Sequence, residues 1–386
     1  MPGFDNELER IVGELNRVAP GGPPESTTAS RPVPSGSSLE QLLGFASDRR
    51  ASDLILVAES PVVFRINGSI APGSPAPLSA DDVQNLLIPM FTPDQRRDLQ
   101  QKRSLDFSFV RPNGKRCRAN IHYQRGTMAA CIRLLPARTP SLESLNLPPV
   151  LARFTERRQG LVLVTGPTGC GKTSTLAALI DLINKRSRYH IVTIEDPVEY
   201  HYANAQSVVE QIEVGRDTLD FGYCLRSILR QSPDVILVGE MRDAETMATV
   251  LTAAETGHLV FSTLHTNDTV QAVSRILDSF PAGNQAQIRQ QMSLALAAVV
   301  AQQLLPGTDG VSRYPAVEIM VANDAVRNLI RRGEDHQLRL QLSIGRAEGM
   351  MTMEQSLAEL VRAGRISKET AFAHCYRADD LKRHLD

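Results

Sequence analysis

Two patterns of apolar and polar residues follow each other along the 386-residue chain, and the change falls near residue 160. Between about residues 38 and 136, a short helical segment leads into brief apolar runs. Turn residues such as Asn67-Gly68 and Pro112-Asn113-Gly114 separate these runs. Strands joined by tight turns pair in antiparallel fashion, so this part is predicted to be a small α+β domain.

From about residue 160, apolar runs alternate with helical segments. The runs are LVLV, IVTI, VILV and LVFS, and they begin at residues 161, 191, 235 and 259. This alternation is typical of βαβ units and predicts an α/β domain whose largely parallel sheet is covered on both faces. The apolar stretch Leu294–Ala301 is short enough to be a buried helix segment, and the chain is expected to be mostly helical from about residue 323.

Residues 1–37 form a separate N-terminal segment. The stretch FDNELERIVGELNRV, residues 4–18, places its apolar residues at helical spacing, and a linker rich in Pro, Gly and Ser follows it. Two interpretations stay open: a dispensable tail, or a tethered helix that docks on a partner or a neighbouring subunit.

Composition excludes several classes of protein. The five cysteines include no CxxC pair, which argues against a disulfide framework and a paired-thiolate zinc site. The N-terminus lacks the layout of a signal peptide, and no run approaches the roughly 18 apolar residues of a membrane span. A net charge of −1 with interspersed signs does not indicate a nucleic-acid surface. A cytoplasmic protein without nucleic-acid partners is therefore expected.

The segment that follows the run at 161 matches the phosphate-binding pattern GxxxxGK[ST]. Its glycines let successive backbone N–H groups face an anion, and the following helix adds its N-terminus. Lys172 is expected to reach the β- and γ-phosphates of ATP, and the Thr173 hydroxyl to bind Mg²⁺. The predicted nucleotide-binding residues are Gly166, Pro167, Thr168, Gly169, Cys170, Gly171, Lys172, Thr173 and Ser174.

Three later apolar runs end in residues that can take part in hydrolysis. They end at Glu195, Glu240 and His265, and ligands bind at the carboxyl ends of strands in open α/β sheets. One carboxylate can orient or deprotonate the attacking water while another holds the Mg²⁺ shell, for which Glu240 is the candidate. His258 and His265 flank the run LVFSTL. Because their separation along a strand is odd, they point to opposite faces or lie at opposite ends of the strand.

Four stretches carry a family resemblance. They are GLVLVTGPTGCGKTSTLAALID, HIVTIEDPVEY, RDTLDFGYCLRSILRQSPDVILVGEMRDAET and LTAAETGHLVFSTLHT. The chain resembles the secretion-ATPase superfamily over roughly residues 39–373 and, within it, is most similar to the retraction ATPases of type IV pili.

The resemblance implies a fold, an assembly and a location. It implies a PAS-like N-terminal domain (38–138), a hinge or linker (139–159) and a RecA-like ATPase domain with C-terminal helices (160–386), after the N-terminal segment 1–37. It also implies a homohexamer that hydrolyses ATP with Mg²⁺ between subunits. Such a motor is expected at the cytoplasmic face of the inner membrane, on a pilus platform protein. A second pilus ATPase is a further candidate partner.

The resemblance also assigns residue roles. The stretch IVTIEDPVEY, residues 191–200, is the acidic box, and Glu195 in it is the expected catalytic carboxylate. The stretch DVILVGE is the atypical Walker B motif and contains Glu240. His258 and His265 belong to the histidine box. Strands with the sequences KRCRAN and CIRLLP match strands that carry arginines to the nucleotide, so the candidate charge-neutralising residues are Arg116, Arg118 and Arg133.

Three positions depart from the family pattern. The family's SDLHL is SDLIL here, Cys170 replaces a serine, and the retraction motif AIRNLIRE is AVRNLIRR, so that Arg332 replaces an acid. The last change leaves a pilus-assembly or type II secretion ATPase and an accessory retraction ATPase as alternatives. The absence of paired cysteines argues against the first. A DNA motor and a non-hydrolysing ring are disfavoured by the charge pattern and by the intact acids.

Overall fold

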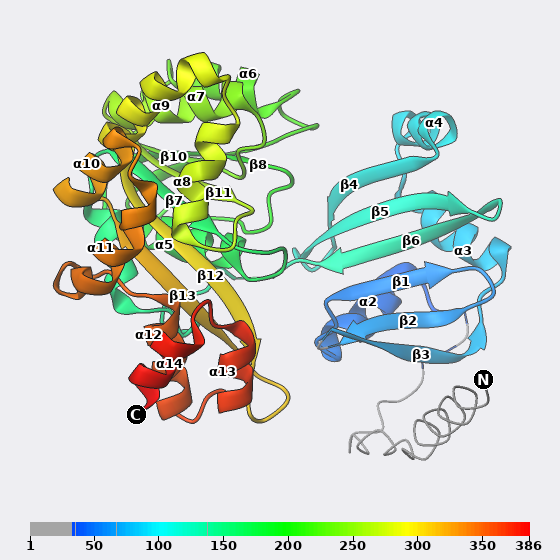
Figure 1. The fold of residues 1–386 in the computed structure, drawn as a ribbon. Coiled ribbons are helices and arrows are strands. Elements are labelled where there is room, and N and C mark those ends of the chain that lie inside the picture. The colour runs from blue at the N-terminus through cyan, green and yellow to red at the C-terminus, as the bar shows by residue number, and fades with distance from the viewer. Residues whose placement is uncertain (1–32, 35, 67, 137) are drawn as a thin grey trace, which may run out of the picture. The chain divides into compact units, whose positions relative to one another are not determined.

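The computed structural model describes residues 33–34, 36–66, 68–136 and 138–386 (Figure 1). The predicted helix at residues 4–18 and most of the linker that follows it lie outside these residues. Both interpretations of this segment therefore stay predictions.

By their contacts, the described residues divide into two compact units. The first contains the chain up to Phe91 together with Gln124–Ala129, and the second contains Thr92–Tyr123 and Ala130–Asp386. This division differs from the predicted domain boundary near residue 138, because residues 92–123 group with the C-terminal part of the chain. The predicted PAS-like domain of residues 38–138 stays a prediction.

The described residues up to Phe91 in the first unit form antiparallel strands and α-helices. The elements are α2 (Leu39–Asp48), β1 (Asp53–Val57), β2 (Pro61–Ile66), β3 (Ser69–Pro77), α3 (Ala80–Leu87) and a 3₁₀ turn at Ile88–Met90. Ile66 pairs with Ser69, so the chain reverses between β2 and β3. Serine caps begin both helices, since the Ser38 and Ser79 hydroxyls accept from the third backbone N–H. The predicted antiparallel strands are confirmed.

The second unit begins with α4 (Pro93–Lys102) and the antiparallel pair β4 (Ser104–Val110) and β5 (Arg116–Gln124). Val110 pairs with Arg116 across the turn that was predicted at Pro112-Asn113-Gly114. Strand β6 (Thr127–Leu134) starts in the first unit and continues into the second.

A seven-stranded sheet forms the centre of the second unit, in the order β13-β12-β7-β11-β10-β8-β9 (Figure 1). Its strands are β7 (Gly160–Thr165), β8 (His190–Glu195), β9 (Val208–Glu213), β10 (Val235–Val238), β11 (Leu259–Leu264), β12 (Leu296–Pro306) and β13 (Arg313–Val321). Every neighbouring pair is parallel except β12 with β13. The four predicted apolar runs are strands of this parallel sheet.

One sequence prediction of local structure is wrong. The apolar stretch Leu294–Ala301 is not a helix segment, since helix α9 (Ala282–Ala295) ends within it and β12 begins at Leu296. A short apolar run does not distinguish a buried strand from a buried helix by periodicity. The strand forms here because β12 is inserted between β7 and β13 and pairs with both.

Side chains of the sheet alternate between two apolar layers. On one face, Leu163, Ile236 and Val260 belong to a buried cluster with helices α6 to α10. On the other face, Val162 and Phe261 belong to a cluster with helix α5 and the 3₁₀ segment Pro149–Glu156. The remaining bounds are α5 (Lys172–Arg186), α6 (Phe221–Ile228), α7 (Ala244–Glu255), α8 (Thr269–Asp278) and α10 (Asp324–Arg332). The expected coverage of both faces is confirmed.

Part of the predicted hinge at residues 139–159 packs into this core. Leu147, Leu151 and Phe154 are buried in the same cluster as Val162. This stretch is therefore held by the second unit, and a hinge that joins the domains stays a prediction.

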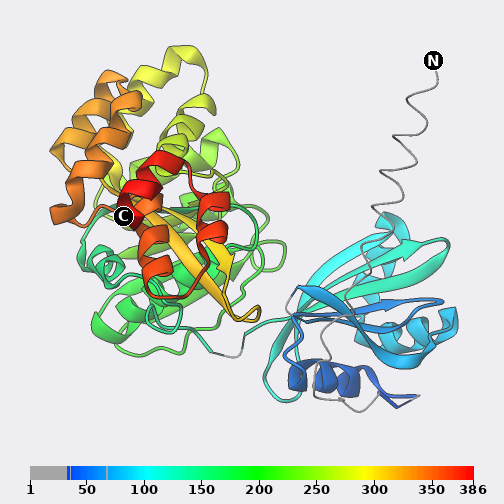
Figure 2. The same ribbon diagram turned by 60° about the horizontal axis from the view of Figure 1, so that its bottom comes forward.

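The C-terminal part is helical, as predicted, and packs beside β12 and β13 (Figure 2). Its elements are α11 (Leu338–Ile344), α12 (Met353–Arg362), α13 (Lys368–His374) and α14 (Ala378–Leu385), with 3₁₀ turns at Asp335–Gln337 and Gly345–Glu348. Across the described part of the chain, none of the helices combines the length and the apolar character needed to span a bilayer.

Candidate active site

A glycine-rich loop connects β7 to α5 and forms the centre of the site. It runs from Gly166 to Gly171, and three of its glycines have positive φ: 145° at Gly166, 81° at Gly169 and 93° at Gly171. A Cβ on Gly166 would lie 2.2 Å from the Gln302 carbonyl oxygen, so this position excludes any side chain. The base of the loop is fixed by Thr165, whose hydroxyl accepts from the Thr266 N–H at 2.9 Å.

Lys172 is the first residue of α5, and its side chain folds back over the loop. Its ammonium group donates to the carbonyl oxygens of Gly166 at 2.8 Å and Pro167 at 3.0 Å. It also lies 3.5 Å from Nδ1 of His265. Burial lowers the pKa of Lys172, while the nearby Glu240 opposes this shift. The Lys172 ammonium group is therefore held at the loop by two carbonyl oxygens, which a bound phosphate can replace as hydrogen-bond acceptors.

Glu240 and His265 complete a chain of polar groups with Lys172. Glu240 follows β10, and one of its carboxylate oxygens lies 3.5 Å from Nε2 of His265, which follows β11. Arg242 forms an ion pair with the other oxygen at 2.5 Å. Strands β7, β11 and β10 are neighbours, so their carboxyl ends bring these predicted residues together.

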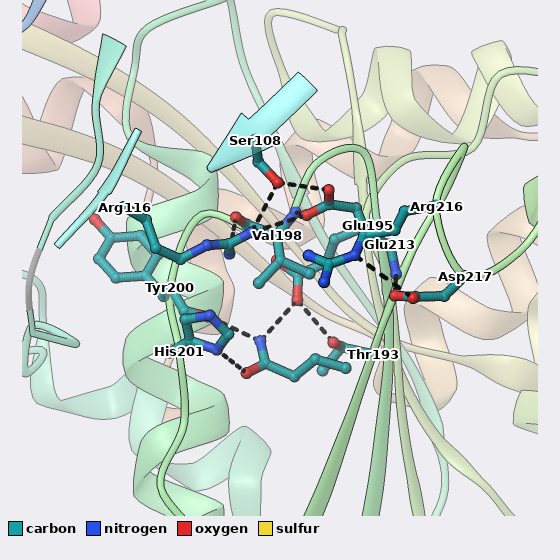
Figure 3. Close-up of polar contacts among 11 residues, drawn as sticks. Ser108, Arg116, Thr193, Glu195, Val198, Tyr200, His201, Glu213, Arg216 and Asp217 are labelled. Carbon is teal, nitrogen blue, oxygen red and sulfur yellow. Dashed lines mark hydrogen bonds and ion pairs between the residues drawn. The ribbon is translucent and has the colours of Figure 1, made fainter. Parts of the chain in front are cut away.

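Glu195 ends β8 and lies in the protein interior, 5% exposed. Its carboxylate accepts hydrogen bonds from the Thr193 hydroxyl at 2.7 Å and the Gln211 amide at 3.3 Å (Figure 3). Burial raises the pKa of Glu195 from 4.5 to about 7, and the neighbouring charge of Glu199 adds to the increase. Such a pKa suits a group that exchanges a proton near neutral pH.

Arg116 is engaged in a buried ion pair rather than at the loop. Its guanidinium group donates to a Glu213 carboxylate oxygen at 3.0 Å, to the Val198 carbonyl at 2.6 Å and to the Ser108 hydroxyl at 3.0 Å (Figure 3). The Arg116 and Glu213 side chains are only 7% and 8% exposed. In this structure Arg116 therefore ties β5 to the segment after β8.

The other two candidate arginines lie near a different carboxylate. The charges of Arg133 and Arg118 oppose the rise in the pKa of Glu199 that burial causes, so both guanidinium groups are close to Glu199. Arg118 is partly exposed and lies 3.9 Å from an Asp106 oxygen. Both arginines therefore act electrostatically on Glu199, four residues after Glu195.

His258 is separated from the rest of the site. It precedes Leu259, which pairs with Gly160 at the start of β7, whereas the glycine-rich loop follows the end of β7. Its Nδ1 donates to the Ala253 carbonyl at 3.0 Å. His258 and His265 thus lie at opposite ends of β11, one of the two arrangements that their spacing allowed.

Several residues that hold the site together were not identified from the sequence. The Tyr200 hydroxyl bonds to the Ser174 hydroxyl at 2.8 Å, which connects the acidic box to the start of α5. Gln211 and Glu213 point from β9 toward Glu195 and Arg116. Gln302 bonds to the loop itself. For Gln302 the signal was a polar residue within an otherwise apolar strand run. Tyr200 lies outside the strands, and β9 mixes apolar and polar residues, so the sequence carried no such signal for the other positions.

The residues at the loop fit a nucleotide with Mg²⁺. The described residues contain no group of three or more His, Cys, Asp or Glu side chains that could hold a metal ion. Mg²⁺ in nucleotide sites takes only one or two protein ligands and shares the phosphates. An exposed Thr173 hydroxyl and the Glu240 carboxylate meet that requirement.

The variant retraction motif forms helix α10. Arg327 donates to the carbonyls of Ser293, Leu294 and Leu296 and so anchors α10 to the end of α9. Arg332, which replaces the acid of the motif, pairs with Glu334 at 2.9 Å. The reversed charge therefore has a carboxylate partner within two residues.

Comparisons with known proteins give consistent results. Residues 129–369 match the family described as "Type II/IV secretion system protein". The "Twitching motility protein" of Neisseria gonorrhoeae is 46% identical over 83% of this chain and 85% of its own length. The "Type IV pilus retractation ATPase PilT" of Pseudomonas aeruginosa is 42% identical over 86% of this chain and 96% of its own.

The fold is also similar to a solved structure. The crystal structure of the pilus retraction motor PilT with bound ADP superposes with a TM-score of 0.83 at 42% identity. The similarity covers 90% of this chain and 99% of that chain. The α/β fold described above is therefore the fold of this ADP-binding motor.

The raised pKa of Glu195 predicts how stability depends on pH. Because the folded-state pKa lies above the ordinary value of 4.5, ionisation destabilises the folded chain as pH rises from about 4.5 to about 7. Relative to Glu195→Gln, the unfolding free energy of the wild type should fall by about 3 kcal/mol over this range. Urea unfolding at several pH values measures the difference, and a constant difference would contradict a buried carboxyl that keeps its proton.

The buried ion pair predicts a large loss of stability on truncation. Glu213→Ala leaves the Arg116 guanidinium buried without its carboxylate, and should lower the unfolding free energy by about 3–5 kcal/mol. The matched control is Glu245→Ala, which removes a carboxylate from an exposed ion pair with Arg226 and should cost about 1 kcal/mol or less. Equal losses in the two variants, measured by denaturant unfolding, would show that burial does not set the contribution of the Arg116 pair.

Proposed function

The chain belongs to the family of type II/IV secretion system proteins, and we propose that it is an ATP-hydrolysing motor that powers retraction of type IV pili. The observation that carries the proposal is the meeting of Lys172, His265 and Glu240 at the glycine-rich loop. Relatives over most of the chain's length carry the names of twitching and retraction proteins.

The residues of the site divide the work of phosphoryl transfer. The backbone N–H groups of the loop and the Lys172 ammonium neutralise the charge of the β- and γ-phosphates. Glu240 and Thr173 hold Mg²⁺, which spreads that charge further. Glu195, with a pKa near neutrality, is the candidate for the base that takes a proton from the attacking water. His265 lies between Lys172 and Glu240 and orients both.

The finer architecture follows from the same proposal. The second unit is RecA-like, because its glycine-rich loop follows a central parallel strand and its acids follow neighbouring strands. The antiparallel sheet of the N-terminal part belongs to a PAS-like domain. Six copies form a ring in which ATP lies between subunits, since head-to-tail contacts that close on themselves give rings.

The arginines and His258 complete the site in this arrangement. Arg118 and Arg133 lie beside Glu199 and are the candidates to neutralise phosphate charge, within the chain or across the subunit boundary. Arg116 holds the strand that carries Arg118 through its ion pair with Glu213. His258 lies at the far end of β11, where it can act only on another subunit's site or as a structural residue.

The motor acts at the cytoplasmic face of the inner membrane, where it drives a pilus platform protein. A second pilus ATPase can share this platform. The relatives' names favour retraction, and Arg332 of the variant motif has a carboxylate partner in Glu334. A pilus-assembly or secretion role and an accessory retraction role are the alternatives.

Substitutions at the loop test the chemistry. Lys172→Ala should lose nucleotide binding, because it removes the phosphate-binding cation. Glu240→Gln should keep binding ATP but lower turnover by about 100-fold or more. Binding measured with a fluorescent ADP analogue and turnover measured as phosphate release separate the two effects. Wild-type turnover in Glu240→Gln would exclude Glu240 from the hydrolytic site.

Deletion of the gene in its host tests the direction of the motor. Cells should remain piliated but lose twitching, and Glu240→Gln should not restore it. Bald cells would indicate an assembly motor instead. Twitching that is weakened but not lost would indicate an accessory role beside a second retraction ATPase.

A further inference from the structure

Gln302 is a buried polar residue in the apolar strand β12. It is 3% exposed, and the residues that precede it in the strand are buried and mostly alanine and valine. Strand β12 pairs in parallel with β7, and Ala301 lies opposite Thr165. The next residue of each strand is Gln302 on β12 and Gly166 on the β7 side. The register therefore places the Gln302 backbone against Gly166, at the start of the glycine-rich loop.

Both ends of the Gln302 amide contact the loop region. Its Nε2 donates to the Cys170 carbonyl at 2.6 Å, and its Oε1 accepts from the Thr175 hydroxyl at 2.7 Å. A carbonyl only accepts hydrogen bonds, so the amide nitrogen must face Cys170. One side chain thus connects the last part of the loop to the first turn of α5.

The loop also lies in close contact with Gln302. A Cβ on Gly166 would lie 2.2 Å from the Gln302 carbonyl oxygen, and a Cβ on Gly171 would lie 2.9 Å from Nε2 of Gln302. Both glycines have positive φ, which only glycine adopts at low cost. Gly166 and Gly171 of the phosphate-binding pattern are therefore required for two reasons. A side chain at either position would collide with Gln302 of β12, and the phosphate also needs close approach to the backbone.

The hydrogen bond to the Cys170 carbonyl has a consequence for the nucleotide site. The Cys170 carbonyl and the Gly171 N–H belong to one planar trans peptide, so they point in opposite directions. When Gln302 holds the carbonyl toward β12, the Gly171 N–H points to the other side of the loop. A phosphate-binding loop needs its N–H groups on that inner side.

We propose that Gln302 is a positioning residue that holds the Cys170–Gly171 peptide in the orientation that binds the phosphates of a nucleotide. This inference rests on the proposed nucleotide site and adds a residue outside its motifs. Without the amide, the Cys170 carbonyl loses its buried partner, and rotation of that peptide toward another donor turns the Gly171 N–H away from the phosphate.

Gln302→Met tests the proposal, because methionine has a similar length and no hydrogen-bonding amide. The dissociation constant for ADP should rise roughly tenfold, the size expected for one lost hydrogen bond in a buried site. The KM for ATP should rise by a similar factor, while kcat changes by about twofold or less. Titration calorimetry on the full chain gives the ADP affinity together with the number of competent sites.

Two further variants separate positioning from folding. Gln303→Met is the matched control, since Gln303 on the same strand contacts Tyr376 and the His374 carbonyl instead of the loop. It should leave the ADP affinity unchanged. Thr175→Val removes the second contact of Gln302 but keeps the bond to Cys170, so it should weaken ADP binding less than Gln302→Met.

The outcomes distinguish this inference from the proposed function. An unchanged ADP affinity in Gln302→Met would overturn the positioning role, and so would equal losses of affinity in Gln302→Met and Gln303→Met. The nucleotide site would still stand in both cases, provided that the wild-type chain binds ADP. A smaller number of ADP-binding sites with an unchanged dissociation constant would also overturn the positioning role. That result would mean that part of the Gln302→Met protein is unfolded and that the folded part binds ADP normally. Absence of ADP binding by the wild type would refute the proposed function itself.

Discussion

Strand β7 is paired in parallel on both of its sides, and the rest of the site depends on this arrangement. Its last residue, Thr165, lies opposite Leu264 of β11 and opposite Ala301 of β12. The chain therefore leaves β7 into the glycine-rich loop at the same edge where His265 and Gln302 arrive. A shift of one residue in either register would turn these side chains to the other face of the sheet.

Three carboxylates of the second unit have different surroundings and so have different properties. Glu240 is partly accessible and lies between His265 and Arg242. Glu195 is buried with hydroxyl and amide donors, and its pKa is raised to about 7. Glu213 is equally buried but lies against Arg116, so its charge is compensated. The burial of each carboxylate and the charge of its partner decide whether it can exchange a proton or stabilises the fold as part of an ion pair.

The segment from Glu195 to Tyr200 connects the start of α5 to strand β5 within the second unit. Tyr200 contacts Ser174 at the start of α5, and the Val198 carbonyl accepts from Arg116 of β5. Direct contacts therefore connect the phosphate end of α5 to β5, which carries Arg116 and Arg118. A motor requires a connection of this kind between its nucleotide and the part that moves.

The sequence by itself determined the features that are local in the chain. Glycine spacing in the loop, the alternation of strands and helices, and the acids at Glu195 and Glu240 all follow from neighbouring residues, because period and turn chemistry act over a few positions. Only the tertiary structure decided that Leu296–Pro306 is a strand and that Arg116 pairs with Glu213. It also decided that Gln302 supports Cys170, 132 residues away in sequence. Such pairings depend on which strands become neighbours, and no local pattern of side chains specifies that choice.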